Sequence, residues 1–412
     1  MNRNLKSNRS NRKWPATLLG ALALFLLGCH CIDPISTSTA ATDAARRARM
    51  SGPSHRFPIG IYGVGTVPDL EAVSAAGFSL VTGPLNRDFM GTALARGVGV
   101  IASPGTSAGP SFDPVAARIA IGQWDRHRAL AAWYVIDEPD MAGLAPDSVE
   151  LAHKTLLNAG ASKPTALVVC RGPNLALFHS TDILMVDFYP VGWIPIPAFF
   201  QHMRHGATAA SAANKKFIAV IQAMDWDLYR EDFPFPEPFQ PRPPSEAELR
   251  SMAWGSRVLG ADGLFFYPYR DGKWEMPERP ETWKALTNVV HEIRHWETIF
   301  AAARSGYPPS TEMVSEYFNE ALEAPILWSV RKVECGNAHV ATGNYWIMVN
   351  TTERIQHFRV LDTEWQNTSQ LSLLTGEKMV IDEDGWIEGL KPFEVRILGP
   401  VVSALESSKV TK

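Results

Sequence analysis

Two adjacent acidic residues stand at the end of a predicted strand. An apolar run at 132–136 is followed directly by Asp137, Glu138 and Pro139. Proline stops a strand and side chains alternate along it, so the two carboxylates should point in different directions where the strand ends. Cleavage of a glycosidic bond needs a carboxylic acid to protonate the leaving oxygen, with a second carboxylate acting as nucleophile, as base or on a substrate group. The pattern predicts Glu138 as general acid with Asp137 beside it; the alternative is a solvated pair of loop carboxylates.

A second acid follows the strand predicted at 183–188. This segment ends in Asp187, Phe188, Tyr189 and Pro190, which places a carboxylate and a phenol before another proline. Three roles are open for Asp187: the partner carboxylate of Glu138, a ligand for sugar hydroxyls, or a cap of the next turn. Tyr189 is a candidate substrate-binding residue.

The strand predicted at 217–222 ends in an amide. Gln222 cannot act as a nucleophile, but it could position water or hydrogen-bond a sugar. Asp225 follows three residues later and could reach the site, with Trp226 as a stacking platform for a sugar ring. The second carboxylate is therefore open among Asp137, Asp187 and Asp225.

The strand predicted at 263–267 ends in aromatic residues and a cation. Tyr267, Tyr269 and Arg270 are candidate residues of a sugar subsite. Arg270 could match an acidic sugar, and a surface ion pair explains it equally well.

Eight strand-helix pairs position these residues. Apolar strand candidates alternate with longer helical segments, as expected for βα units around a parallel sheet. The strands are predicted at 59–64, 79–82, 99–102, 132–136, 165–169, 183–188, 217–222 and 263–267, and the helices at 68–76, 87–96, 114–130, 146–158, 173–180, 197–213, 245–259 and 281–303. The count and size predict an α/β fold, a closed (β/α)8 TIM barrel over 57–304, with function at the carboxyl ends of its strands. An open doubly wound sheet is the alternative, and no glycine-rich dinucleotide turn supports it.

The chain changes character after residue 304. Alternating segments at 326–333, 345–349, 356–360 and 394–398 are separated by turn residues and indicate antiparallel strands. We expect a small β-sandwich over 305–402 and a tail over 403–412. The β-sandwich could bind sugar or only cover the flank of the barrel.

The strand ends together resemble the clan A (β/α)8 glycoside hydrolases. Their fourth strand ends in Asn-Glu-Pro, where Glu is the acid/base, and the resemblance implies that role for Glu138. Asp137 replaces the usual Asn, and Tyr189 lies near the position of a Tyr that orients the nucleophile. The clan carries its nucleophilic Glu where this chain has Gln222.

Three consequences of Gln222 are open: an inverting hydrolase with a separate base, an enzyme in which Asp137 steers a substrate acetamido group as the Asp-Glu pairs of some hexosaminidases do, or lost catalysis. The resemblance therefore implies a glycoside hydrolase acting on an extracellular or periplasmic poly- or oligosaccharide. A non-catalytic glycan-binding lipoprotein on a degenerate barrel is the alternative.

Composition narrows the range of partners. With 412 residues, 46% hydrophobic content and a formal net charge of -4, the chain suits a large globular domain and lacks the positive field that attracts nucleic acid. Thirteen Trp, nineteen Phe and nine Tyr suit a carbohydrate partner. We find no Gly-x-Ser-x-Gly, phosphate-loop or His-Glu-x-x-His motif, so neither a metal nor a cofactor is expected. The sequence does not predict an oligomeric state.

The N-terminus resembles a bacterial lipoprotein signal. Basic residues precede a short apolar run at 16–27, and Leu26, Leu27, Gly28 and Cys29 match the lipobox. We expect a signal peptide over 1–28, lipidation at Cys29 and a tether over 29–56. The protein would then be exported and held at the cell envelope by a lipid anchor, facing the periplasm or on the outer membrane, and otherwise secreted.

Overall fold

The computed structural model describes residues 56–232, 235, 239–306, 309–313, 324–362, 368–386 and 389–401. The predicted signal peptide, Cys29, most of the tether and the predicted tail lie outside the described residues. Within the described ranges, no helix is both long and apolar enough to cross a membrane.

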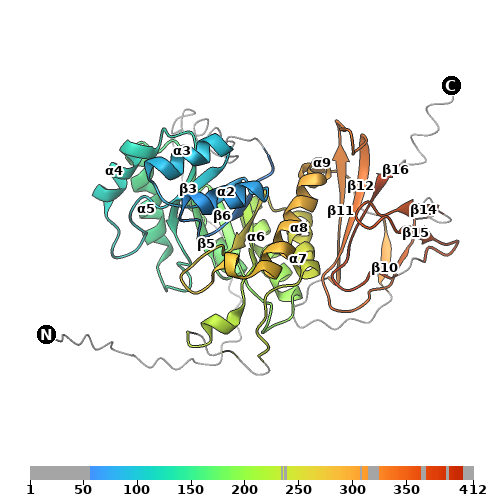
Figure 1. Ribbon diagram of the computed structural model, residues 1–412. Coiled ribbons are helices and arrows are strands. Elements are labelled where there is room, and N and C mark those ends of the chain that lie inside the picture. The colour runs from blue at the N-terminus through green and yellow to red at the C-terminus, as the bar shows by residue number, and fades with distance from the viewer. Residues whose placement is uncertain are drawn as a thin grey trace, which may run out of the picture. The chain divides into compact units, whose positions relative to one another are not determined.

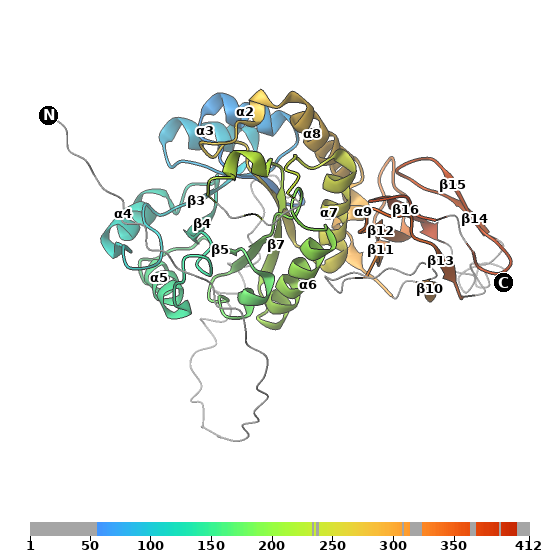
Figure 2. The ribbon, with the colours of Figure 1, turned by 90° about the horizontal axis from the view of Figure 1, so that it is seen from below.

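Eight parallel strands close into a barrel (Figure 2), which confirms the predicted (β/α)8 architecture. Three predicted strands match the observed bounds, and the other five differ by at most three residues at an end. The pairing of Gly60 in the first strand with Phe265 in the last closes the ring. The strands are β1 (Ile59–Ile61), β2 (Leu80–Thr82), β3 (Gly99–Ala102), β4 (Leu130–Ile136), β5 (Thr165–Val169), β6 (Ile183–Asp187), β7 (Lys216–Gln222) and β8 (Gly263–Tyr267).

The barrel interior is filled by apolar side chains. Phe265 is fully buried against Gly60 and Tyr62. The adjacent Phe266 points to the other face of β8 and is fully buried against Phe78. A Cβ at Gly60 would lie 2.3 Å from the ring of Phe265, so this position of β1 has no room for a side chain. The strands are buried on both faces, which is why they read as continuous apolar runs in the sequence.

Helices surround the barrel (Figure 1 and Figure 2), and four of the eight α-helices of the described residues begin at a residue whose side chain caps the first turn. Ser245 and Glu248 form the predicted capping box, with Ser245 N donating to Glu248 Oε2 at 2.8 Å. The helices are α2 (Val67–Ala75), α3 (Arg87–Arg96), α4 (Pro114–Trp124), α5 (Pro146–Asn158), α6 (Pro197–Ala212), α7 (Glu246–Leu259), α8 (Pro280–His295) and α9 (Glu297–Ala301), with the short 3-10 turns η1 (Gly172–Ala176), η2 (Trp226–Tyr229) and η3 (Met276–Glu278).

Three helix predictions need correction. The helix expected at 114–130 ends at Trp124, and Leu130 is the first residue of β4. The helix expected at 173–180 is wrong in type, because the 3-10 turn η1 takes its place. A Cβ at Gly172 would lie 2.1 Å from the backbone oxygen of His202, so this short connection packs directly on α6. The helix expected at 281–303 divides at Trp296 into α8 and α9.

The C-terminal region is antiparallel β structure. Its largest sheet has the order β16-β12-β11-β9, and two two-stranded sheets pair β10 with β13 and β14 with β15. Figure 1 shows β11, β12 and β16 side by side. A β-sandwich remains a prediction. The strands are β9 (Ala303–Arg304), β10 (Thr311–Met313), β11 (Ile326–Val333), β12 (Gly343–Asn350), β13 (Phe358–Val360), β14 (Thr368–Leu371), β15 (Lys378–Ile381) and β16 (Val395–Val401).

Hydrogen bonds join this sheet to the barrel helices. The buried Arg331 of β11 donates to the backbone oxygens of Ala302 at 3.1 Å and Arg257 at 2.5 Å. Ser251 Oγ of α7 donates to Asn350 O of β12 at 3.0 Å. The four-stranded sheet is therefore attached to α7 and to the end of α9.

Candidate active site

The backbone turns sharply at Glu138, directly after β4. Glu138 has a φ of 41°, a left-handed conformation that is uncommon for a residue with a side chain. Its N–H donates to Val168 O of β5 at 3.1 Å, and its carbonyl accepts from Met141 N and Ala142 N. The turn therefore ends the strand and places the Glu138 carboxyl at the carboxyl end of the barrel, where barrel enzymes bind their substrates.

Asp140 fixes this turn to the loop after β5. Its Oδ1 accepts from Cys170 N at 3.1 Å, and its Oδ2 accepts from Arg171 N and Asn174 Nδ2, each at 3.0 Å. These three donors occupy both carboxylate oxygens. Asp140 is thus a brace between two neighbouring strand ends, a role that the sequence analysis missed.

Asp137 is held by a tyrosine from its own strand. Tyr134 Oη donates to Asp137 Oδ1 at 2.5 Å, and the hydroxyls of Tyr134 and Tyr62 lie 3.2 Å apart. Loss of solvent to neighbouring groups raises the pKa of Asp137, although the residue is exposed at the surface, and the Tyr134 hydrogen bond works in the opposite direction. A chain of two phenols therefore orients this carboxyl.

The environment of Glu138 suits an acid that works near neutral pH. Burial, and then the charge of Asp137, raise its pKa from 4.5 to about 7. A hydrogen bond from Asp187 lowers it and the charge of Asp140 raises it, both by less. A carboxylic acid with such a pKa can hold its proton at neutral pH and still release it during a reaction.

Asp187, at the end of β6, lies beside Glu138. It is the last residue of that strand and is only 7% exposed. Tyr189 Oη donates to its Oδ2 at 3.3 Å, and its carboxyl shares a hydrogen bond with the carboxyl of Glu138. Burial, followed by the charges of Glu138 and Asp137, raises the pKa of Asp187 well above its ordinary value. Three carboxyl groups from two strand ends therefore form one cluster.

Tyrosine rings surround the carboxyl cluster. Tyr189 and Tyr267 stack with ring centroids 5.3 Å apart and planes 13° apart. Tyr62 meets Tyr134 and Tyr267 edge to face at 6.2 and 5.8 Å. Tyr267 Oη donates to Asp271 Oδ2 at 2.8 Å, which fixes the phenol. These four rings form a tyrosine wall, in which Tyr134 and Tyr267 are partly exposed and Tyr62 and Tyr189 are buried.

The residues predicted at the end of β7 have different surroundings. Gln222 is fully buried, and its amide bonds to the backbone of Val191 and Met224, so the structure gives it a structural role. Asp225 caps η2 by accepting from Asp227 N at 2.9 Å. Trp226 Nε1 donates to Tyr189 O at 3.0 Å, which brings the indole beside the tyrosine wall.

Tyr269 and Arg270 make structural contacts. Tyr269 is 4% exposed and packs edge to face on Trp283 of α8. Arg270 donates to both oxygens of Asp69 at 3.0 and 3.1 Å and also pairs with Glu275. Of the two readings that the sequence left open for Arg270, the ion pair is the one observed.

Sequence reasoning missed Tyr62, Tyr134 and Asp271. Tyr62 follows the observed β1 directly, but the sequence prediction extended that strand to residue 64, which placed Tyr62 inside the strand and not at its end. Tyr134 lies inside β4 and reads as core, and Asp271 lies in a loop. Their partners, not their positions in the sequence, reveal their roles.

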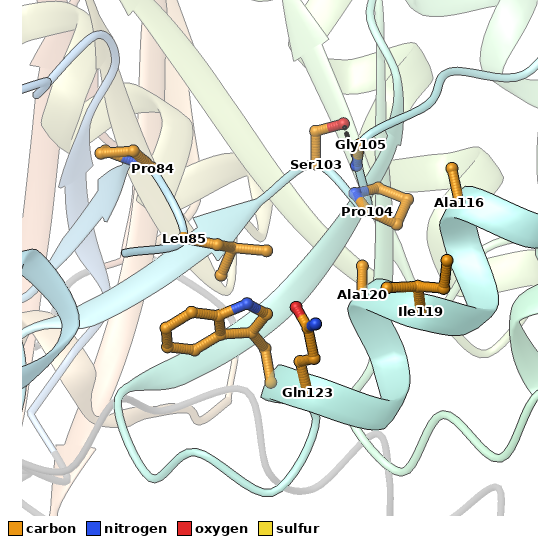
Figure 3. A pocket seen from close by; sticks show the side chains of 11 residues that line it. Pro84, Leu85, Ser103, Pro104, Gly105, Ala116, Ile119, Ala120 and Gln123 are labelled. Carbon is orange, nitrogen blue, oxygen red and sulfur yellow. Dashed lines mark hydrogen bonds between the residues drawn. The ribbon is translucent and has the colours of Figure 1, made fainter. Parts of the chain in front are cut away.

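A separate pocket lies next to the carboxyl ends of β2 and β3 (Figure 3). Its volume is about 490 Å³, and the loops after β2 and β3 line it together with α4. Ile119, Ala120 and Trp124 give it a mostly apolar wall. No residue of the carboxyl cluster lines it, so we do not assign it to the chemistry. In the part of the chain that the structure describes, no three His, Cys, Asp or Glu residues are arranged to hold a metal ion.

Comparison with known proteins identifies the fold class. The sequence matches no protein-family model and no curated protein. The structure is similar to a GH42 beta-galactosidase from G. stearothermophilus (TM-score 0.53, 8% identity, covering 84% of this chain and 98% of that one) and to an Anoxybacillus alpha-amylase (0.51, 9%, 86% and 99%). It is also similar to AmyP in complex with maltose (0.50, 8%, 91% and 99%). The barrel is therefore of the type found in (β/α)8 glycoside hydrolases, and the likeness concerns the fold alone. No individual family is assigned.

Proposed function

We propose that the protein is a glycoside hydrolase that acts on an extracellular or periplasmic poly- or oligosaccharide, with Glu138 as its general acid. The observation that carries the proposal is the Glu138 carboxyl, with a pKa of about 7, beside Asp137 and Asp187 at the carboxyl end of the barrel. Tyr134 and Tyr267, the partly exposed rings of the tyrosine wall, add aromatic surface on which a sugar can pack, and the fold neighbours include enzymes that cleave glycosidic bonds.

In the proposed reaction, Glu138 passes its proton to the leaving glycosidic oxygen. The bond from the anomeric carbon to that oxygen breaks, and positive charge develops on the sugar ring. Asp137, oriented by Tyr134, supplies negative charge near this ring. Water completes the reaction at the anomeric carbon, and its released proton returns to the carboxylate cluster.

The contact between Glu138 and Asp187 bears on the second catalytic group. Carboxyl pairs that flank a sugar stand about 5 Å apart in retaining enzymes and roughly 6.5–9.5 Å apart in inverting ones. Hydrogen-bonded carboxyls leave no such gap. The candidates for the opposite face are therefore Asp137, Asp225 or a substrate group such as an acetamido oxygen steered by Asp137.

The test is a screen of oligosaccharides and polysaccharides, followed by analysis of the product anomer. Glu138→Gln should lower kcat on a responsive substrate by at least about a thousandfold while the thermal unfolding transition is retained. Glu150→Gln is the matched control, because Glu150 forms only an exposed ion pair with Lys154 on α5. Unchanged turnover in Glu138→Gln would refute the assignment.

A second candidate is a glycan-binding protein without catalysis, and the observation that favours it is the structural use of Gln222 at the end of β7. Glycan-array binding that is equal in the natural protein and in Glu138→Gln, without any turnover, would support this candidate.

We also propose export and lipid anchoring through Cys29, on the sequence pattern described above. Cys29→Ser should move the protein from the membrane fraction to the soluble fraction. Retention at the membrane would contradict the anchor.

A further inference from the structure

One oxygen of Asp187 has no donor. Tyr189 Oη donates a hydrogen bond to Oδ2. The other oxygen, Oδ1, is buried, and no N–H or O–H of the described residues donates to it. A buried acceptor without a partner is costly. Because solvent does not reach Oδ1, a substrate hydroxyl cannot reach it in this conformation either. The group left to satisfy the Asp187 carboxyl is the carboxyl of Glu138, with which it shares a hydrogen bond.

Two carboxyl groups can share a hydrogen bond only when one of them carries a proton. Asp187 is the more deeply buried of the two and Glu138 is nearer to solvent. Burial favours the neutral form of a carboxyl, so the proton belongs on Asp187.

The charges around the pair also favour a retained proton. The titratable and charged groups that face it come from five strand ends: Tyr62 after β1, Tyr134, Asp137 and Asp140 from β4 and its turn, Cys170 and Arg171 after β5, Tyr189 after β6, and Tyr267 of β8. Only Arg171 among them is a cation, and its side chain is exposed. Removal of the shared proton would leave adjacent carboxylates with little to offset their repulsion.

We propose that Asp187 is a positioning residue that keeps its proton at neutral pH and donates a hydrogen bond to Glu138, instead of opposing Glu138 across the sugar. The inference rests on the proposed function and names Asp187 as the hydrogen-bond partner of the general acid Glu138. When the O–H bond of Glu138 breaks and its proton moves to the leaving oxygen, the new carboxylate accepts the Asp187 hydrogen bond. Asp187 keeps its own proton throughout, and the attacking water supplies the proton that restores Glu138.

The kinetic test compares two substitutions of Asp187. An Asn amide can still donate to Glu138, so Asp187→Asn should retain kcat within about tenfold of the natural protein, whereas Asp187→Ala should lose about a hundredfold, with KM nearly constant in both. If Asp187 were instead the base or the nucleophile, it would need a carboxylate. Asp187→Asn would then be as impaired as Asp187→Ala. That outcome overturns the inference.

A spectroscopic test needs no substrate. The infrared difference spectrum between the natural protein and Asp187→Asn at pH 7 should contain the C=O band of a protonated carboxyl. Asp113→Asn is the matched control, because Asp113 is an exposed helix cap whose role Asn can fill, and its difference spectrum should lack that band. Absence of the band from the Asp187→Asn spectrum also overturns the inference. If no glycan is hydrolysed but the band is present, the proposed function fails while the shared proton stands.

Discussion

The side-chain amide of Gln222 pairs with both backbone polar groups of Val191. Its Oε1 accepts from Val191 N at 2.8 Å and its Nε2 donates to Val191 O at 3.0 Å. Nε2 also donates to Met224 O at 3.1 Å, so the amide ties the end of β7 to the loop after β6. That loop follows Tyr189 directly. The Gln222–Val191 pairing therefore helps to hold Tyr189, and with it the tyrosine wall, in place.

We expect Gln222→Glu to destabilise the protein without creating a nucleophile. A carboxylate has no N–H to donate, so it would face the carbonyls of Val191 and Met224 in a fully buried site. The free energy of unfolding should fall by about 2–4 kcal/mol in urea denaturation. Exposed Gln123→Glu on α4 serves as the matched control. A stable Gln222→Glu variant that hydrolyses a substrate faster would show that the amide faces the reaction.

The stability of the protein should depend on pH through Glu138. Its pKa is about 7 in the folded chain and 4.5 ordinarily, so the folded state binds more protons than the unfolded state between these values. The free energy of unfolding therefore falls as pH rises through this window, by roughly 3 kcal/mol at 1.36 kcal/mol per pKa unit. Glu138→Gln lacks this titration. The stability of the Gln variant relative to the natural protein should rise between pH 4.5 and pH 8, and this rise belongs to the coupled pair, because Glu138 also raises the pKa of Asp187.

Urea denaturation of both proteins at several pH values measures this difference. The informative quantity is the change with pH of the stability difference between the two proteins. A stability difference that is the same at every pH reflects packing or hydrogen bonding. A difference that stays constant from pH 4.5 to pH 8 would mean that Glu138 titrates normally in the folded chain.

The activity should fall above neutral pH. The acid is protonated below its pKa, so kcat/KM should decrease above about pH 7, where Glu138 loses its proton. Asp137→Asn removes the charge that is the second cause of the raised pKa, so the basic limb of the profile should shift to lower pH in any variant activity that remains. A basic limb that does not move would exclude Asp137 as a neighbour that sets the acidity of Glu138.

The strand pattern was sufficient to predict the barrel and the end of the barrel at which the candidate site residues lie. Carboxyl ends of barrel strands converge on one face, so the strand ends placed Glu138 and Asp187 at the same end of the barrel, but they left three roles open for Asp187. The hydrogen bond between the two carboxyls required the conformation of Glu138, whose positive φ no local pattern signals. The role of Gln222 depended on the path of another loop. The connection after β5 is a 3-10 turn whose Gly172 packs on the backbone of His202, a contact between distant segments that no local pattern signals.

Arg270 shows the same limit, since its partner Asp69 lies 201 positions away in the sequence. We expect Arg270→Ala to lower the free energy of unfolding by about 1.5–3 kcal/mol, because the nearly buried Asp69 would lose two charged hydrogen bonds. The preference between neutral and acidic sugars should not change, since the guanidinium is already occupied. Arg96→Ala, which breaks only an exposed pair with Glu71, should cost less than about 1 kcal/mol. If Arg270→Ala kept full stability and selectively lost kcat/KM on uronate-containing substrates, Arg270 would belong to a subsite after all.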